Sequence, residues 1–149
     1  MNKKFLPYRM LAGFVGVYHI MLGLLLLFSG EMAINAAKSM AGMTIIGSPQ
    51  FGVIGEILAC YFIAFGLMMG LAAWNPIKNR SLISVGLVLF VLRLLQRLIF
   101  AEKTMEVFQM SSARYWSFFV ILLAISIILG FFRIMIYKDL KNHDKISME

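Results

Sequence analysis

Four long apolar segments dominate the chain, and their length restricts its fold more than any other feature. They run over Leu11 to Phe28, Phe51 to Trp74, Leu82 to Phe100 and Tyr115 to Ile136. Each is close to the 17 to 25 residues that an α-helix needs to cross a hydrocarbon core of roughly 30 Å. Helices satisfy their backbone hydrogen bonds internally, as lipid requires. The sequence therefore predicts an all-α integral membrane four-helix bundle, with residues 1–149 forming one four-span transmembrane domain.

Composition supports a membrane protein and argues against several other classes. Hydrophobic residues make up 61% of the chain and charged residues 14%, which is outside the usual range for a soluble domain. The net charge of +7 is spread over termini and connections, so nucleic-acid binding is not expected. The single cysteine, Cys60, excludes an internal disulfide and a multi-thiolate metal site. We expect neither a metal nor a permanent cofactor.

The first apolar segment follows a basic stretch and therefore has to be distinguished from a secretory signal peptide. Its apolar run of about 18 residues is longer than the roughly 7 to 15 residues of a signal-peptide core. No cleavage site of the A-x-A kind follows it. We expect this segment to remain in the protein as a membrane helix.

Lysine and arginine are distributed unevenly between the two sides of the predicted bundle. One side, with both termini and the second connection, has Lys3, Lys4, Arg9, Lys78, Arg80, Lys138, Lys141 and Lys145; the other has Lys38, Lys103 and Arg114. Cytoplasmic loops carry the excess of positive residues in membrane proteins. The pattern predicts a multi-pass protein with a cytoplasmic N-terminus and C-terminus.

The three connections differ in character. The second, Asn75 to Ser81, is short and contains an Asn-Pro step, so it predicts an antiparallel hairpin of the second and third spans. The third, Glu102 to Ser112, is polar and is expected to lie outside the membrane. In the first, Glu31 to Met43 is compatible with a helix that has methionine and alanine on one side. We expect a short amphipathic outer segment in the membrane interface there, rather than a substrate lid.

Polar side chains at membrane depth are the strongest functional signal, because each is costly unless it is paired, hydrated or able to reach the interface. They are His19, Glu56, Arg93, Gln96 and Arg97. Their depths permit one cluster in the outer half of the bundle, with Glu56 facing inward within reach of Arg93 or Arg97. Two functions stay open for the cluster: a structural ion pair, or a binding site for an anionic or carbonyl-bearing ligand.

The available acid and base candidates, Glu56 and His19, lack an evident nucleophile or metal set. The chain is therefore more easily understood as a non-catalytic protein than as an enzyme. The only other histidine, His143, lies in the predicted tail, which excludes a transmembrane haem held by two histidines.

Small residues recur along three of the spans, where they allow helix backbones to approach closely. They are Gly16, Gly23, Gly66, Gly70, Ser126 and Gly130. Such contacts can form within the bundle or with a partner protein, and both alternatives stay open. The second and third spans are expected to meet through the side of Gly66 and Gly70 or through that of Glu56.

The arrangement resembles the DoxX-like superfamily, and within it the small four-helix BphX-like proteins. The residues that carry the resemblance are Gly16, Gly23, Glu56, Tyr61, Gly66 and Arg97, whereas Arg93 departs from the pattern. The resemblance implies a bacterial inner-membrane protein without a transferable catalytic motif. Because some proteins of this superfamily accompany respiratory complexes as membrane subunits, the resemblance also implies a role of this kind.

Two functions are therefore predicted. The first is an accessory subunit of a larger respiratory or electron-transfer complex, with other membrane proteins as partners. The second is a lipid- or quinone-binding or transport protein that uses the intramembrane polar cluster. Membrane lipids are expected partners in both cases.

Overall fold

The computed structural model describes residues 5–45 and 47–146, which form helices and short connections without a β-strand. In chain order the elements are α1 (Leu6–Phe28), α2 (Gly30–Ala36), the π-helical turn η2 (Ala37–Ala41), α3 (Pro49–Trp74), α4 (Arg80–Ile99), α5 (Ala101–Val107) and α6 (Ser112–Ile146). In this part of the chain, four helices are long and apolar enough to cross a membrane: α1, α3, α4 and α6. The predicted all-α membrane four-helix bundle is confirmed.

The segment between α1 and α3 is helical, as predicted. The Ser29 hydroxyl accepts a hydrogen bond from the backbone N–H of Met32 and so caps the start of α2. Gly42, with φ of 65°, ends η2 in the left-handed region that glycine adopts without strain. The Ser48 hydroxyl then caps α3 by accepting from the N–H of Phe51.

Helical structure extends beyond the predicted spans in two places. Helix α5 occupies residues Ala101–Val107 of the third connection. Helix α6 continues past the end of the predicted span, near Ile136, to Ile146. The cause is the same in both places: hydropathy marks where a helix leaves the membrane, whereas the helix itself continues through polar residues of good helical propensity.

The long helices associate as two antiparallel pairs. In the first, α1 and α3 approach closely enough that a Cβ atom on Gly23 would lie 2.9 Å from the carbonyl oxygen of Ala59. In the second, the Tyr115 hydroxyl of α6 donates to the Arg97 carbonyl of α4 at 2.6 Å. The Arg133 Nε of α6 also donates to the Ser84 hydroxyl of α4 at 2.7 Å.

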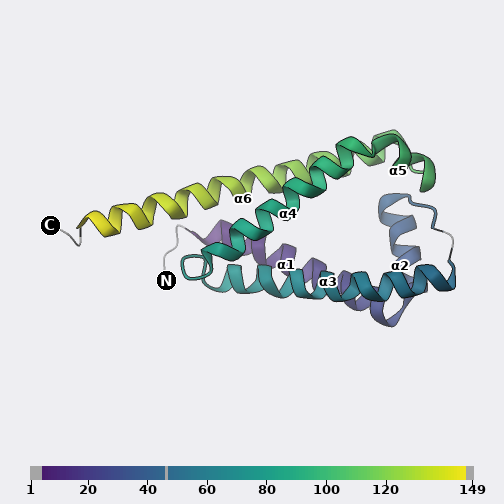
Figure 1. The fold of residues 1–149 in the computed structure, drawn as a ribbon, viewed down its shortest axis with the longest axis horizontal. Helices are drawn as coiled ribbons and strands as arrows, with labels where there is room; N and C mark the ends of the chain where they lie inside the picture. The colour runs from purple at the N-terminus through teal and green to yellow at the C-terminus, as the bar shows by residue number, and fades with distance from the viewer. Residues whose placement is uncertain (1–4, 46, 147–149) are drawn as a thin grey trace.

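The two pairs join at the end of the bundle that holds the α3–α4 turn, and they diverge toward the opposite end (Figure 1). The shared core lies at the joined end and is built from all four long helices: Tyr8, Ala12, Val15, Met69, Ala72, Ile83, Phe90, Leu129 and Ile136. At the far end the connections touch, because the Thr44 N–H donates to the Phe108 carbonyl at 2.8 Å. The divergence leaves space between α1/α3 and α4 that side chains only partly fill.

Small residues make the contacts within each pair. Gly16, Gly23 and Gly66 lie between α1 and α3. Ser126 is buried in α6, and Gly130 faces Leu87 of α4. The second and third spans do not meet through Gly66 and Gly70, because that side of α3 lies against α1. Instead α3 meets α4 through Met69, whose sulfur lies beside Gly86.

Candidate ligand pocket

A pocket of about 390 Å³ lies where α4 diverges from the α1/α3 pair. Its walls are His19 of α1, Tyr61, Phe62 and Phe65 of α3, and Leu89, Phe90, Arg93 and Gln96 of α4. Phe65 and Phe90 touch edge to face, with ring centroids 5.8 Å apart, and this contact joins the two walls. The pocket therefore combines an aromatic lining with three polar side chains.

His19 is oriented by its own helix. Its Nδ1 lies 2.7 Å from the Val15 carbonyl oxygen. Since a carbonyl can only accept, Nδ1 must carry the hydrogen and Nε2 is left as the nitrogen that can interact with a ligand. The ring is half-buried and packs edge to face against Phe65 at 4.7 Å. Packing and hydrogen bonding thus hold the imidazole in one orientation.

Arg93 and Gln96 supply the other polar groups. They are three residues apart and therefore project from the same face of α4. Both side chains are exposed within this chain and both line the pocket. A guanidinium offers five donors, and an amide offers donors and an acceptor. Their N–H groups can donate to a carbonyl or an anionic oxygen, whereas His19 Nε2 can accept from a hydroxyl group of a ligand.

Arg97 belongs to a different contact, although it is one turn from Arg93. Its guanidinium carbon lies 5.1 Å from the centre of the Tyr115 ring, a cation–π arrangement between α4 and α6. Its Nη1 is buried and has no hydrogen-bond partner among the described residues. Arg97 is thus a positive charge beside the pocket rather than in its wall.

Glu56 is not brought to the arginines. Its side chain is exposed, it does not line the pocket, and no ion pair joins it to Arg93 or Arg97 within the described residues. The buried face of α3 contains Gly55 and Ala59, one residue earlier than the face expected from Glu56 and Cys60. A shift of one residue turns a helix by about 100°, which is enough to point Glu56 away from the cluster.

Of the five predicted residues, the pocket therefore contains His19, Arg93 and Gln96. The sequence prediction missed its aromatic wall. Phe62 and Phe65 are spaced i, i+3 on α3, at the register of Phe90 and Arg93 in an antiparallel hairpin. Pairing the two helices residue by residue outward from the Asn75 turn would have located them. Among the described residues, no three His, Cys, Asp or Glu side chains come together to hold a metal.

Four apolar spans, three of which line this pocket, define the chain as a multi-pass helical membrane protein. No protein-family model, curated protein or solved structure matches it. The resemblance to the DoxX-like superfamily therefore stays a prediction.

Proposed function

We propose that the chain is a non-catalytic membrane protein that binds a lipid-soluble molecule with a carbonyl or anionic oxygen in the pocket. The observation that carries this proposal is the convergence of His19, Arg93 and Gln96 on one aromatic-lined space. Arg93 and the neighbouring Arg97 also form no ion pair with a described carboxylate, so an electron-rich ligand oxygen would complete the cluster. The two source classes for such an oxygen are a quinone and a lipid headgroup.

The position of Glu56 supports a binding role over a catalytic one. His19 is the remaining acid or base in the pocket, and Glu56 lies outside the lining and exposed. Catalysis by a general acid and base requires both groups within hydrogen-bond reach of one substrate. A histidine in a fixed orientation, the Arg93 guanidinium and the Gln96 amide suit the binding of a ligand rather than catalysis.

Binding can be tested with the purified protein in nanodiscs, titrated with a short-chain ubiquinone in one arm and phosphatidylglycerol in the other. His19→Phe keeps the aromatic packing but removes Nε2, and Arg93→Gln removes the charge. We expect Arg93→Gln to weaken binding of the true ligand class at least tenfold, and His19→Phe to weaken binding of phosphatidylglycerol, whose headgroup hydroxyls can donate to Nε2. The matched controls are Tyr18→Phe and Arg80→Gln, which change side chains outside the pocket wall.

Equal affinities for the parent protein and both pocket variants in both arms would overturn the proposal. An effect confined to one arm would identify the ligand class. A circular-dichroism melt of each variant separates loss of binding from loss of fold.

The accessory-subunit function is the second proposal. The divergence of the two helix pairs supports it, because α3 and α4 expose apolar side chains such as Ile57 and Leu92 that a partner helix could cover. A place beside a respiratory or electron-transfer complex of a bacterial inner membrane, as in some DoxX-like proteins, belongs to this proposal. Co-purification from the native membrane in mild detergent tests it, and a chain that always migrates alone contradicts it.

A further inference from the structure

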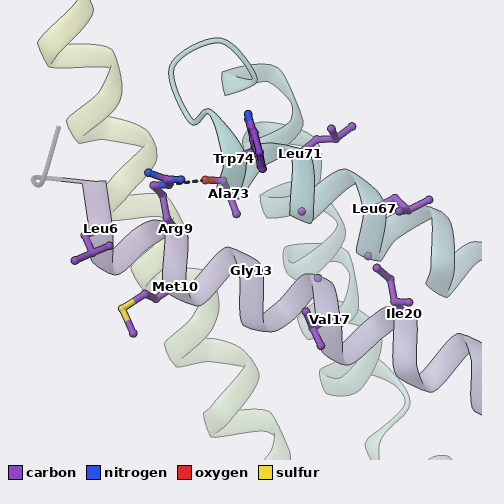
Figure 2. Close-up of a pocket in the computed structure, with 13 residues that line it drawn as sticks. Leu6, Arg9, Met10, Gly13, Val17, Ile20, Leu67, Leu71, Ala73 and Trp74 are labelled. Atoms are coloured by element: carbon purple, nitrogen blue, oxygen red, sulfur yellow. Dashed lines mark hydrogen bonds between the residues drawn. The ribbon is translucent and has the colours of Figure 1, made fainter. Parts of the chain in front are cut away.

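A second hollow lies in the groove between α1 and α3. Figure 2 shows the side chains of both helices that line this groove. Its volume is about 570 Å³. The lining residues are Leu6, Arg9, Met10, Gly13, Gly16, Val17, Ile20, Gly66, Leu67, Gly70, Leu71, Ala73 and Trp74. None of them lines the pocket described above.

The groove has exposed apolar edges and a low floor. Along its edges, Met10 is 68% exposed and Trp74 is 81% exposed. On its floor, a Cβ atom on Gly70 would have no neighbour within 4 Å. Among the described residues, nothing covers this groove.

Arg9 introduces charge at one end of the groove. Its Nε donates to the Ala73 carbonyl at 2.9 Å, as the dashed line in Figure 2 shows. This bond holds the guanidinium beside Trp74 and leaves both Nη atoms without a hydrogen-bond partner among the described residues. Arg9 lies in the first turn of the span Leu6–Phe28, and Trp74 is the last residue of the span Gln50–Trp74. Tryptophan and arginine at the ends of spans contact lipid headgroups. The charged end of the groove is therefore at headgroup level.

The length of the groove suits a hydrocarbon chain. From Leu6 to Ile20 it follows about 21 Å of helix axis. This length exceeds the roughly 15 Å depth of the hydrocarbon in one leaflet. An extended acyl chain fits such a groove.

We propose that this groove binds an anionic phospholipid, with one acyl chain along the Gly70 floor and the phosphate on the Nη atoms of Arg9. A guanidinium binds phosphate oxygens through two parallel N–H donors, and here its orientation is already set by Ala73. The remaining lining is apolar apart from the Trp74 indole. The chemistry of the groove thus matches a lipid with a charged head and a single inserted tail.

Two substitutions separate the head and tail contributions. Arg9→Gln removes the charge, and Arg80→Gln is the control, because it removes an exposed arginine that does not line the groove. Gly70→Leu fills the floor where space is open, and Gly52→Leu is its control, because Gly52 lies on the same helix, also has no neighbour within 4 Å and lines neither hollow. A Cβ atom added at either glycine would therefore not clash with α1.

The measurement is native mass spectrometry of the full chain after exchange into micelles containing equal phosphatidylglycerol and phosphatidylcholine. We expect the parent protein and both controls to retain phosphatidylglycerol at least fivefold over phosphatidylcholine. Arg9→Gln should abolish this preference, and Gly70→Leu should reduce retention of both lipids at least fivefold. Unchanged retention in either variant, or loss of a dimer or bound protein rather than lipid in Gly70→Leu, would overturn the proposal.

Discussion

Gly16 of α1 and Gly66 of α3 pack backbone against backbone: a Cβ on Gly16 would lie 2.8 Å from the Gly66 carbonyl oxygen, and a Cβ on Gly66 would lie 2.6 Å from that of Gly16. The contact is reciprocal and involves main chain on both sides, so neither helix can yield by rotating a side chain. In lipid, where helices gain little from hydrophobic burial against each other, close packing of this kind provides much of the association energy.

Gly66→Val should therefore separate α1 from α3 and destabilise the bundle by about 1 to 3 kcal/mol, the usual range for overpacking. Gly52→Val is the control, because its Cβ meets no atom within 4 Å. Unfolding of both variants can be followed by steric trapping in bicelles. Equal stability of the two would show that α1 and α3 do not meet at Gly66.

Tyr115→Phe should destabilise the α4/α6 pair while preserving its packing. The substitution removes the hydroxyl that donates to the Arg97 carbonyl at 2.6 Å but keeps the ring beneath the guanidinium. Hydrogen bonds between membrane helices contribute about 0.6 kcal/mol on average and up to about 1.7 kcal/mol, so a loss in this range is expected. Tyr137→Phe, at an exposed position on the same helix, serves as the reference in the same unfolding assay. A loss no greater than in that reference would indicate that the Tyr115 hydroxyl bond is absent.

Glu56→Gln should leave stability unchanged or raise it. The carboxylate is exposed, lies within a candidate span and has no described partner, and a neutral amide is less costly there than a charge. For the same reason, Glu56→Gln and Arg97→Leu should be additive in a double-mutant cycle. A coupling energy above about 1 kcal/mol would instead show that Glu56 and Arg97 form the ion pair expected from the sequence.

The fold was predictable to the extent that it depends on hydropathy. Four spans and the helical segment after α1 follow from residue patterns that neighbouring helices do not alter. The pairing of α1 with α3 and of α4 with α6 was not predictable, because the spans are apolar on most sides and their periodicity does not mark an inner face. Glu56 shows the consequence: its depth was estimated from the chain, but its direction depends on Gly55 and Ala59 facing α1.

The orientation predicted from the lysine and arginine distribution can be checked with reporter fusions. A fusion after Glu149 should report the cytoplasm, and one inserted near Asn35 in α2 should report the external side, because positive residues concentrate in cytoplasmic connections. A cytoplasmic alkaline phosphatase is inactive, whereas a cytoplasmic fluorescent protein is bright, so the two reporters check each other. The same compartment for both sites would contradict the four-span topology.

Disulfide crosslinking can test the divergence of α3 and α4, on which the ligand pocket depends. At the joined end, the Met69 sulfur lies 2.9 Å from a Cβ built on Gly86, so the two positions face each other and Met69→Cys with Gly86→Cys should crosslink. Ile57→Cys with Leu98→Cys occupies the same register of a closed hairpin, but both positions lie toward the ends of α3 and α4 that are remote from their turn. The two helices separate toward those ends (Figure 1). This second pair should crosslink at least tenfold more slowly. Both pairs are made in a Cys60→Ala background, because the native thiol is exposed. Similar rates for the two pairs would mean that α3 and α4 stay together along their whole length, and a pocket between His19 and Arg93 would then have no room to form.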